Sequence, residues 1–99
     1  MRRNQALMAL AIVGFVGLSM APAHATRCIY PERSVTGPIR STFGAAQNAA
    51  IGAWQASANK KHGRRFSNWY YSGDRSLTCQ WNDRGNRIKC RASAVPCGE

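Results

Sequence analysis

The chain has 99 residues, and its 14 lysine and arginine residues outnumber 4 aspartate and glutamate residues, which gives a formal net charge of +10. A chain of this length forms one domain at most. Because so small a domain buries only about 60% of its unfolded surface, a large self-sufficient core is excluded. The charge favours anionic partners over cationic ones but does not specify the fold.

The first 25 residues have the pattern of a secretory signal peptide. Residues 1–3 carry two arginines, residues 6–20 form an apolar run, and residues 21–25 offer small-residue cleavage sites. The apolar run is shorter than the roughly 20 residues that a membrane helix needs. We expect cleavage after Ala25, with Ala23 as the alternative. The exported chain, periplasmic or extracellular, then has no membrane span and keeps twelve basic residues, a charge of about +8.

Residues 26–41 show no sustained periodicity. Pro31 and Pro38 indicate turns or extended backbone, since proline disfavours a helix at the residue before it. We predict an irregular N-terminal arm over 26–41, which Cys28 ties to the rest of the domain.

The domain over 42–99 begins with the element around which it is organised. Apolar side chains recur there at helical spacing and share one stripe: Phe43, Ala46, Ala50, Ile51, Trp54 and Ala58. Ser41 or Thr42 can cap the start of this helix. Its end is indicated by cations in the last turn and by Gly63, which tolerates left-handed backbone. We predict an amphipathic helix that shields a small sheet, with Trp54 as its main apolar contact.

After this helix the periodicity changes from 3.6 to 2. The aromatic run over 69–71 predicts a short strand. Two further stretches alternate, 75–81 and 88–94, and residues 82–86 have the composition of a turn. The pattern predicts an antiparallel hairpin with an apolar inner face and a basic outer face. The inner face consists of Leu77, Cys79, Trp81, Ile88, Cys90, Ala92 and Ala94.

The hairpin register predicts a disulfide. With the turn centred between Arg84 and Gly85, Cys79 lies opposite Cys90. Opposite Cβ atoms on one face are about 4.5–5.5 Å apart, which is near the range that a disulfide needs. Cys28 and Cys97 then form the second bridge, although four cysteines allow three pairings. A zinc site is the competing use of four cysteines. However, no C-x-x-C pair is present, and the compartments of exported proteins oxidise thiols.

These elements together predict an α+β fold. One amphipathic helix packs on a small two- or three-stranded antiparallel sheet, and disulfides staple the domain. Trp54 and Ile51 of the helix are expected to face Leu77, Trp81 and Ile88 of the hairpin. The other face of the sheet is left to solvent.

The order of these landmarks resembles a group of short, uncharacterised secreted proteins of proteobacteria. The residues that carry the resemblance are Ile51, Trp54, Gly63, Phe66, Trp69, Cys79, Cys90, Pro96 and Cys97. They cover about three-quarters of the exported chain and are mostly core aromatics and cysteines. The resemblance implies no activity.

No catalytic constellation is apparent in the sequence. His62 lies among cations without a carboxylate to orient it, and the four acidic residues are scattered. With all four cysteines in disulfides, no thiol nucleophile is left. We predict a protein that is not an enzyme and that uses no cofactor or metal.

Two basic runs are candidate binding sites. Four cations flank the helix end and precede a candidate aromatic platform: Lys60, Lys61, Arg64 and Arg65, then Trp69, Tyr70 and Tyr71. The outer face of the hairpin carries the second run: Arg87, Lys89 and Arg91. Cations beside aromatic rings suit polyanions, because the cations meet phosphate or sulfate while rings stack on bases or sugars. The alternatives are ordinary solvated faces for the cations and core positions for the tryptophans.

The leading hypothesis is a non-catalytic module that binds anionic polymers or envelope surfaces through Lys60, Lys61, Arg64 and Arg65. We expect the surplus cations of both runs to form one joined basic surface. The alternative is a periplasmic or secreted partner, such as an inhibitor or assembly factor, that docks on an acidic protein. A membrane-active toxin is a third reading, which a helix stripe rich in alanine weakens. The sequence does not indicate the oligomeric state.

Overall fold

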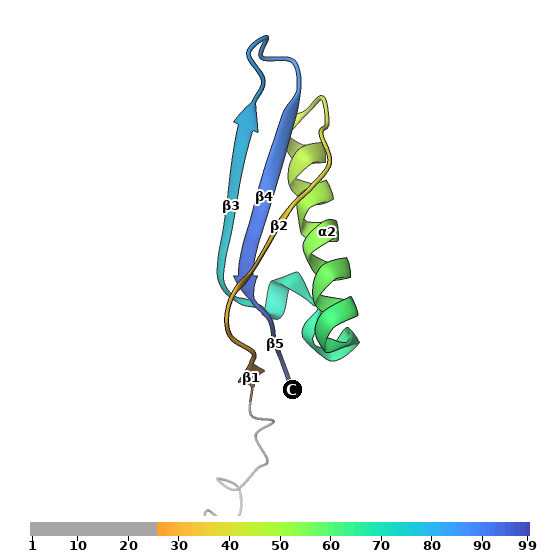
Figure 1. The fold of residues 1–99 in the computed structure, drawn as a ribbon, viewed down its shortest axis with the longest axis vertical. Helices are drawn as coiled ribbons and strands as arrows, with labels where there is room; N and C mark the ends of the chain where they lie inside the picture. Colours follow the sequence, from red (N-terminus) through yellow and green to blue (C-terminus); the bar gives the residue numbers. More distant parts are fainter. Residues whose placement is uncertain (1–25) are drawn as a thin grey trace, which may run out of the picture.

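The computed structural model describes residues 26–99, and the expected signal peptide over 1–25 lies outside them. The described elements are shown in Figure 1. In chain order they are β1 (Arg27–Cys28), β2 (Arg33–Thr36), α2 (Phe43–His62), the 3-10 turns η1 (Arg64–Phe66) and η2 (Trp69–Tyr71), β3 (Gly73–Trp81), β4 (Ile88–Val95) and β5 (Cys97–Gly98).

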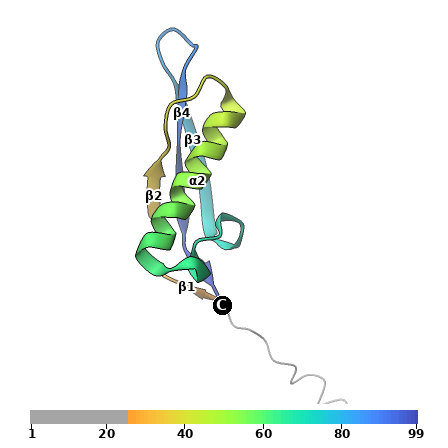
Figure 2. The same cartoon turned by 90° about the vertical axis from the view of Figure 1, so that its right-hand side faces the viewer.

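One helix packs on antiparallel sheets, which confirms the predicted α+β fold. β4 is the central strand of a three-stranded sheet in the order β2-β4-β3, and β1 pairs with β5 in a two-stranded sheet. α2 lies along one face of the larger sheet, and the view turned by 90° shows it in front of the strands (Figure 2).

The ends of α2 follow from local chemistry. Thr42 is extended and its Oγ1 accepts a hydrogen bond from the Ala45 N–H at 3.2 Å, so that it serves as the N-cap. Gly63 has a φ of 95°, a backbone conformation that is unfavourable for residues with a side chain. Its N–H donates to the Asn59 carbonyl at 2.8 Å. Both ends lie where the sequence predicted them.

The core is the contact between the alanine-rich stripe of α2 and the inner face of β4. Its buried members are Ala46, Ala50, Trp54 and Ala58 from the helix with Ile88, Cys90, Ala92 and Ala94 from the strand. Trp54 is fully buried, and its Nε1–H donates to the Arg33 carbonyl at 3.0 Å, which satisfies the one polar atom of its ring. Trp54 is therefore the main apolar contact of the helix, as predicted.

Small residues bring the helix close to the sheet. A Cβ on Gly37, just after β2, would lie 2.7 Å from the Cα and N atoms of Ala50. No side chain fits at that distance, so only glycine allows this approach. Position 37 and the alanine stripe together set how near α2 lies to β2 and β4.

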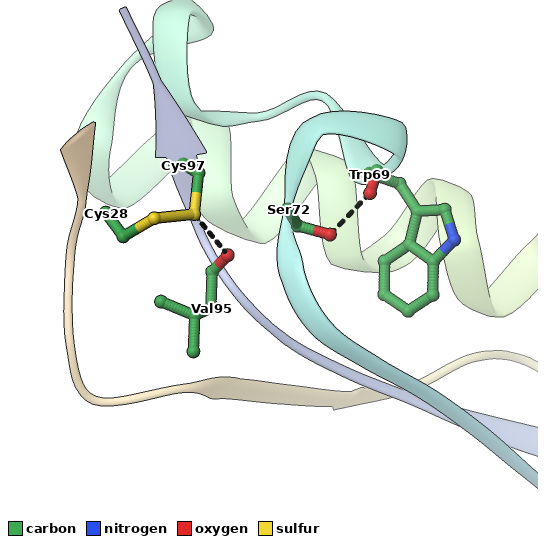
Figure 3. Close-up of a disulfide and its surroundings, with 5 residues drawn as sticks. All are labelled: Cys28, Trp69, Ser72, Val95 and Cys97. Carbon is green, nitrogen blue, oxygen red and sulfur yellow. Dashed lines mark hydrogen bonds between the residues drawn. A yellow bond between two sulfur atoms is a disulfide. The ribbon is translucent and has the colours of Figure 1, made fainter. Parts of the chain in front are cut away.

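Both predicted disulfides are present. Cys79 pairs with Cys90, and Cys28 pairs with Cys97, so all four cysteines are bridged. The predicted hairpin register is also confirmed, with Trp81 opposite Ile88 and Leu77 opposite Ala92. Figure 3 shows the Cys28–Cys97 bridge, in which the Cys97 sulfur lies 3.5 Å from the Val95 carbonyl oxygen.

The segment over 26–41 is more regular than the sequence predicted. It contains β1 and the four-residue β2, which pairs with β4 from Arg33 opposite Ala94 to Thr36 opposite Arg91. The pairing partner lies about 60 residues away along the chain. A local pattern could not reveal it, because β2 alternates only over a few residues.

The aromatic run over 69–71 forms a 3-10 turn, so the predicted short strand is wrong. The Asn68 side-chain oxygen accepts from the Tyr70 N–H at 2.9 Å and starts the turn. The Ser72 hydroxyl donates to the Trp69 carbonyl and closes it (Figure 3). These local side-chain hydrogen bonds outweigh the strand preference of the aromatic residues.

Two large aromatic residues of the predicted core are exposed. Trp81 keeps 47% of its surface accessible and Phe43 keeps 49%. The reason is that α2 packs chiefly against β4 and β2, and only lightly against β3. The inner face of β3 is therefore half-covered, and the helix start extends past the core.

The close approach at Gly37 leads to a prediction with a built-in comparison. Gly37→Ala should destabilise the domain by about 1–3 kcal/mol, because the new methyl group meets helix backbone that cannot move aside. Gly52→Ala, at an exposed helix position with no atom within 4 Å, should stabilise it by about 1 kcal/mol. Urea denaturation measures both, and shifts of the same sign would contradict the argument.

The two disulfides should contribute unequally to stability. They close loops of very different length, with sequence separations of 69 for Cys28–Cys97 and 11 for Cys79–Cys90. Loop entropy gives about 4.4 and about 2.8 kcal/mol respectively. Replacing both cysteines of each pair by alanine and comparing unfolding free energies tests this order, which equal losses would contradict.

Candidate anion-binding surface

The outer face of the three-stranded sheet carries the hairpin cations. Along β4 the side chains alternate, so that Ile88 and Cys90 are buried under α2 while Lys89 and Arg91 are exposed on the opposite face. Arg87, which precedes the strand, is exposed as well. Because β4 is the central strand, this row of cations runs down the middle of the sheet.

Hydroxyl and amide side chains flank the row. The register places Arg91 between Thr36 of β2 and Thr78 of β3, and it places Gln80 opposite Lys89. The Arg91 Nε–H donates to the Thr36 Oγ1 at 3.5 Å, and the Ser34 and Ser93 hydroxyls are hydrogen-bonded to each other. The outer face therefore presents fixed donors and acceptors around its cations.

Two adjoining hollows lie along the hairpin. The larger is lined by cations and hydroxyls of this face, whereas the smaller, at the turn end of the hairpin, also takes in inner-face residues. One has a volume of about 340 Å³ and the other about 480 Å³, and both are lined by Gln80 and Lys89. The first also takes in Ile39, Trp81, Asn82, Asp83, Arg87 and Ile88, and the second takes in Thr36, Thr78, Cys79, Cys90 and Arg91. A carboxylate, Asp83, lines only the first hollow, next to the turn.

The helix-end cations form a separate cluster. Lys60 and Lys61 are exposed in the last turn of α2, and Arg64 and Arg65 are exposed in η1. A Cβ on Gly98 would lie 2.1 Å from the Arg65 carbonyl oxygen, so β5 runs directly against η1. This contact holds the helix-end cluster at the end of the molecule where the chain terminates (Figure 1).

The two basic runs do not meet. The hairpin cations occupy the start of β4 and the outer face, whereas the helix-end cluster lies on the helix side, beyond the end of the eight-residue β4. From Arg91, the fourth residue of β4, the strand continues for four residues to its end at Val95, about 14 Å, which exceeds the Debye length of about 8 Å at physiological salt. The expectation of one joined basic surface is therefore wrong.

The predicted aromatic platform is also divided. Trp69 is only 4% exposed and its ring meets Trp54 edge-to-face with centroids 5.3 Å apart, so it belongs to the core. The backbone N–H of Trp69 donates to the Gln55 side-chain oxygen at 3.0 Å. Tyr70 and Tyr71 are exposed, and Tyr71 lines a hollow of about 540 Å³ with Arg65, Gly98 and Glu99. These tyrosines accompany the helix-end cluster and lie away from the outer sheet face.

Within residues 26–99, no three histidine, cysteine or acidic side chains gather as metal ligands would. In the same range, no helix combines the length and apolar character that a membrane crossing requires.

Comparison with protein-family models, curated proteins and solved structures gives no match for this chain. Its function must therefore be inferred from its own residues.

The burial of Trp69 predicts a contrast with its neighbour. Trp69→Ala should cost about 3–5 kcal/mol, because it empties a core position against Trp54. Tyr70→Ala, at a residue that is 66% exposed, should change stability by no more than about 0.5 kcal/mol. Chemical denaturation of both variants tests this. A small loss for Trp69→Ala would mean that the ring is available to a ligand after all.

Proposed function

We propose that this chain is a small exported basic module, without catalytic activity, that binds anionic polymers or anionic envelope surfaces. The outer face of its three-stranded sheet is the binding surface. Export is supported by the two disulfides, which persist in oxidising compartments, and by the signal-like pattern of residues 1–25.

One observation carries the proposal: three cations stand in a row, two of them on the central strand β4 and one directly before it. Alternate residues of a strand are about 6.8 Å apart, so Arg87, Lys89 and Arg91 offer positive charge at regular intervals along one line. A polymer with repeated phosphate, sulfate or carboxylate groups can meet several of these charges at once. Each contact releases counter-ions, which drives association.

The surroundings of the row suit a sugar-containing or phosphate-containing chain. Arg91 presents a planar guanidinium that can pair with an oxyanion through two hydrogen bonds, while Lys89 acts as a point charge. The hydroxyls of Thr36 and Thr78 can donate to or accept from the groups between successive anions. The sheet holds all of these side chains in fixed register, so little ordering is needed on binding.

The helix-end cluster has a simpler role in this proposal. Lys60 and Lys61 in the last turn complement the negative end of the helix dipole, and all four cations of the cluster add solubility. We therefore expect loss of the outer-face cations to weaken polymer binding more than loss of the helix-end cations, although the two sets carry similar charge.

A matched pair of variants tests the proposal. Arg87→Gln/Lys89→Gln/Arg91→Gln and Lys60→Gln/Lys61→Gln/Arg64→Gln each remove three positive charges, but from different surfaces. Dextran sulfate serves as the probe, and its affinity is measured over a range of salt concentrations. The sheet variant should reduce the magnitude of the slope of log K against log salt by about 2–3, since each lost contact removes about one unit. The helix-end variant should reduce it by less than about 1.

Two results would contradict the proposal. Equal losses in both variants would show that only the total charge matters. An unchanged slope in the sheet variant would show that the outer face does not contact the polymer.

A further inference from the structure

β3 has an unpaired edge. In the sheet order β2-β4-β3, one side of β3 is bonded to β4, and no described residue pairs with its other side. The strand is nine residues long and contains no proline or lysine, the residues that commonly protect such edges. The edge is therefore able to accept another strand.

The hydrogen bonds of the neighbouring strands identify the free groups. Ile88 exchanges two backbone hydrogen bonds of 2.8 Å with Arg40, and Gly37 donates to the Cys90 carbonyl at 2.9 Å, so the even-numbered residues of β4 point their backbone groups toward the β2 side. Lys89 and Arg91 then point theirs toward β3, where they meet Gln80 and Thr78.

It follows that three residues of β3 direct their N–H and C=O groups outward: Leu77, Cys79 and Trp81. Their side chains lie on the inner face, where α2 covers them only in part. Leu77 is half-buried, and Trp81 is 47% exposed. Free backbone groups and half-exposed apolar side chains thus belong to the same residues.

From this coincidence we propose that the β3 edge binds an extended acidic peptide segment of a partner protein as an added antiparallel strand. The added strand would pair with residues 76–81. At the start of β3, a register shift between Gly73 and Ser76 and a φ of 51° at Asp74 interrupt the regular pairing, so the regular part of the edge begins at Ser76. Antiparallel addition continues the pairing of the whole sheet.

The two faces of the edge specify the residue pattern of the partner. On the inner face, the added side chains meet Leu77 and Trp81, which favours apolar residues. On the outer face, they lie beside Thr78 and Gln80 and two strand spacings from Arg91 and Lys89, which favours glutamate or aspartate. Alternating apolar and acidic residues satisfy both faces.

Charge also argues against a second copy of this chain as the occupant. Each copy carries twelve basic residues against 4 acidic ones after residues 1–25 are set aside. Pairing two β3 edges would place two cationic outer faces side by side, where like charges repel. An acidic strand reverses the sign of that interaction.

The proposal can be tested with a seven-residue peptide of alternating valine and glutamate, acetylated and amidated at its ends. Binding should slow amide hydrogen exchange at Leu77, Cys79 and Trp81 at least tenfold. The amides of Ser76, Thr78 and Gln80, which already bond to β4, should change little. A peptide with the same composition in two blocks keeps the charge but not the alternation, and it should bind at least tenfold more weakly.

Backbone methylation of the peptide tests the direction of pairing. In the antiparallel arrangement, the valines lie opposite Leu77 and Trp81, so their N–H groups face β3 and the glutamate N–H groups face away. N-methylation of the valines should abolish binding, and N-methylation of the glutamates should preserve it. The reverse result, or equal effects of both, would overturn the antiparallel arrangement.

Variants of the protein complete the test. Leu77→Pro removes one outward N–H without breaking the ladder to β4 and should weaken binding at least tenfold. Trp81→Gln removes exposed apolar surface but leaves the backbone intact, and it should also weaken binding. It keeps the proposal testable if the proline variant fails to fold. Unchanged affinity in Trp81→Gln together with unchanged exchange at the edge amides would overturn the proposal.

The remaining outcomes are also decisive. Self-association of the protein without peptide, lost in Leu77→Pro, would assign the edge to a second copy and overturn the acidic partner. Neither edge variant alters Arg87, Lys89 or Arg91, so the response to dextran sulfate should stay the same. The edge proposal can therefore fail while the proposed function stands, and the reverse also holds.

Discussion

The close contact between α2 and the strands β2 and β4 is the constraint on which the rest of the structure depends. Alanines at 46, 50 and 58 and the glycine at 37 remove side-chain volume where helix and sheet meet, and Trp54 fills the space that remains. This pulls the helix toward β2 and away from β3. The half-exposed inner face of β3 is a direct result, since a helix centred on the sheet would have covered Leu77 and Trp81.

The covalent links place the charged surfaces. The bridge between Cys28 and Cys97 joins the two ends of the described chain, and β5 then runs against η1 at Gly98. This holds the helix-end cations at one end of the molecule. The bridge between Cys79 and Cys90 holds the hairpin in a register that turns Lys89 and Arg91 outward. Two disulfides and one glycine contact thus separate two basic runs that are close in neither sequence nor space.

The sequence was informative wherever structure is set by neighbours along the chain. The helix ends follow from Thr42 and Gly63, and the hairpin register follows from two cysteines that share a face. It was uninformative where partners are distant. β2 is a strand only because β4 lies beside it, and the exposure of Trp81 depends on where the helix rests. For the site, the sequence named the cations of the outer face, but their separation from the helix-end cluster needed the fold.

The outer face and the β3 edge are neighbours, and this links the two proposals physically. Adjacent strands lie about 4.8 Å apart, so an acidic strand added to β3 would place its carboxylates about 10 Å from the row on β4, close to one Debye length at physiological salt. Long lysine and arginine side chains shorten that distance further. An acidic strand would therefore neutralise part of the field that attracts a polymer, and a bound polymer would repel the strand. The geometry of a central cationic strand beside a free edge would thus make the two proposed ligands antagonists, without any change in the shape of the domain.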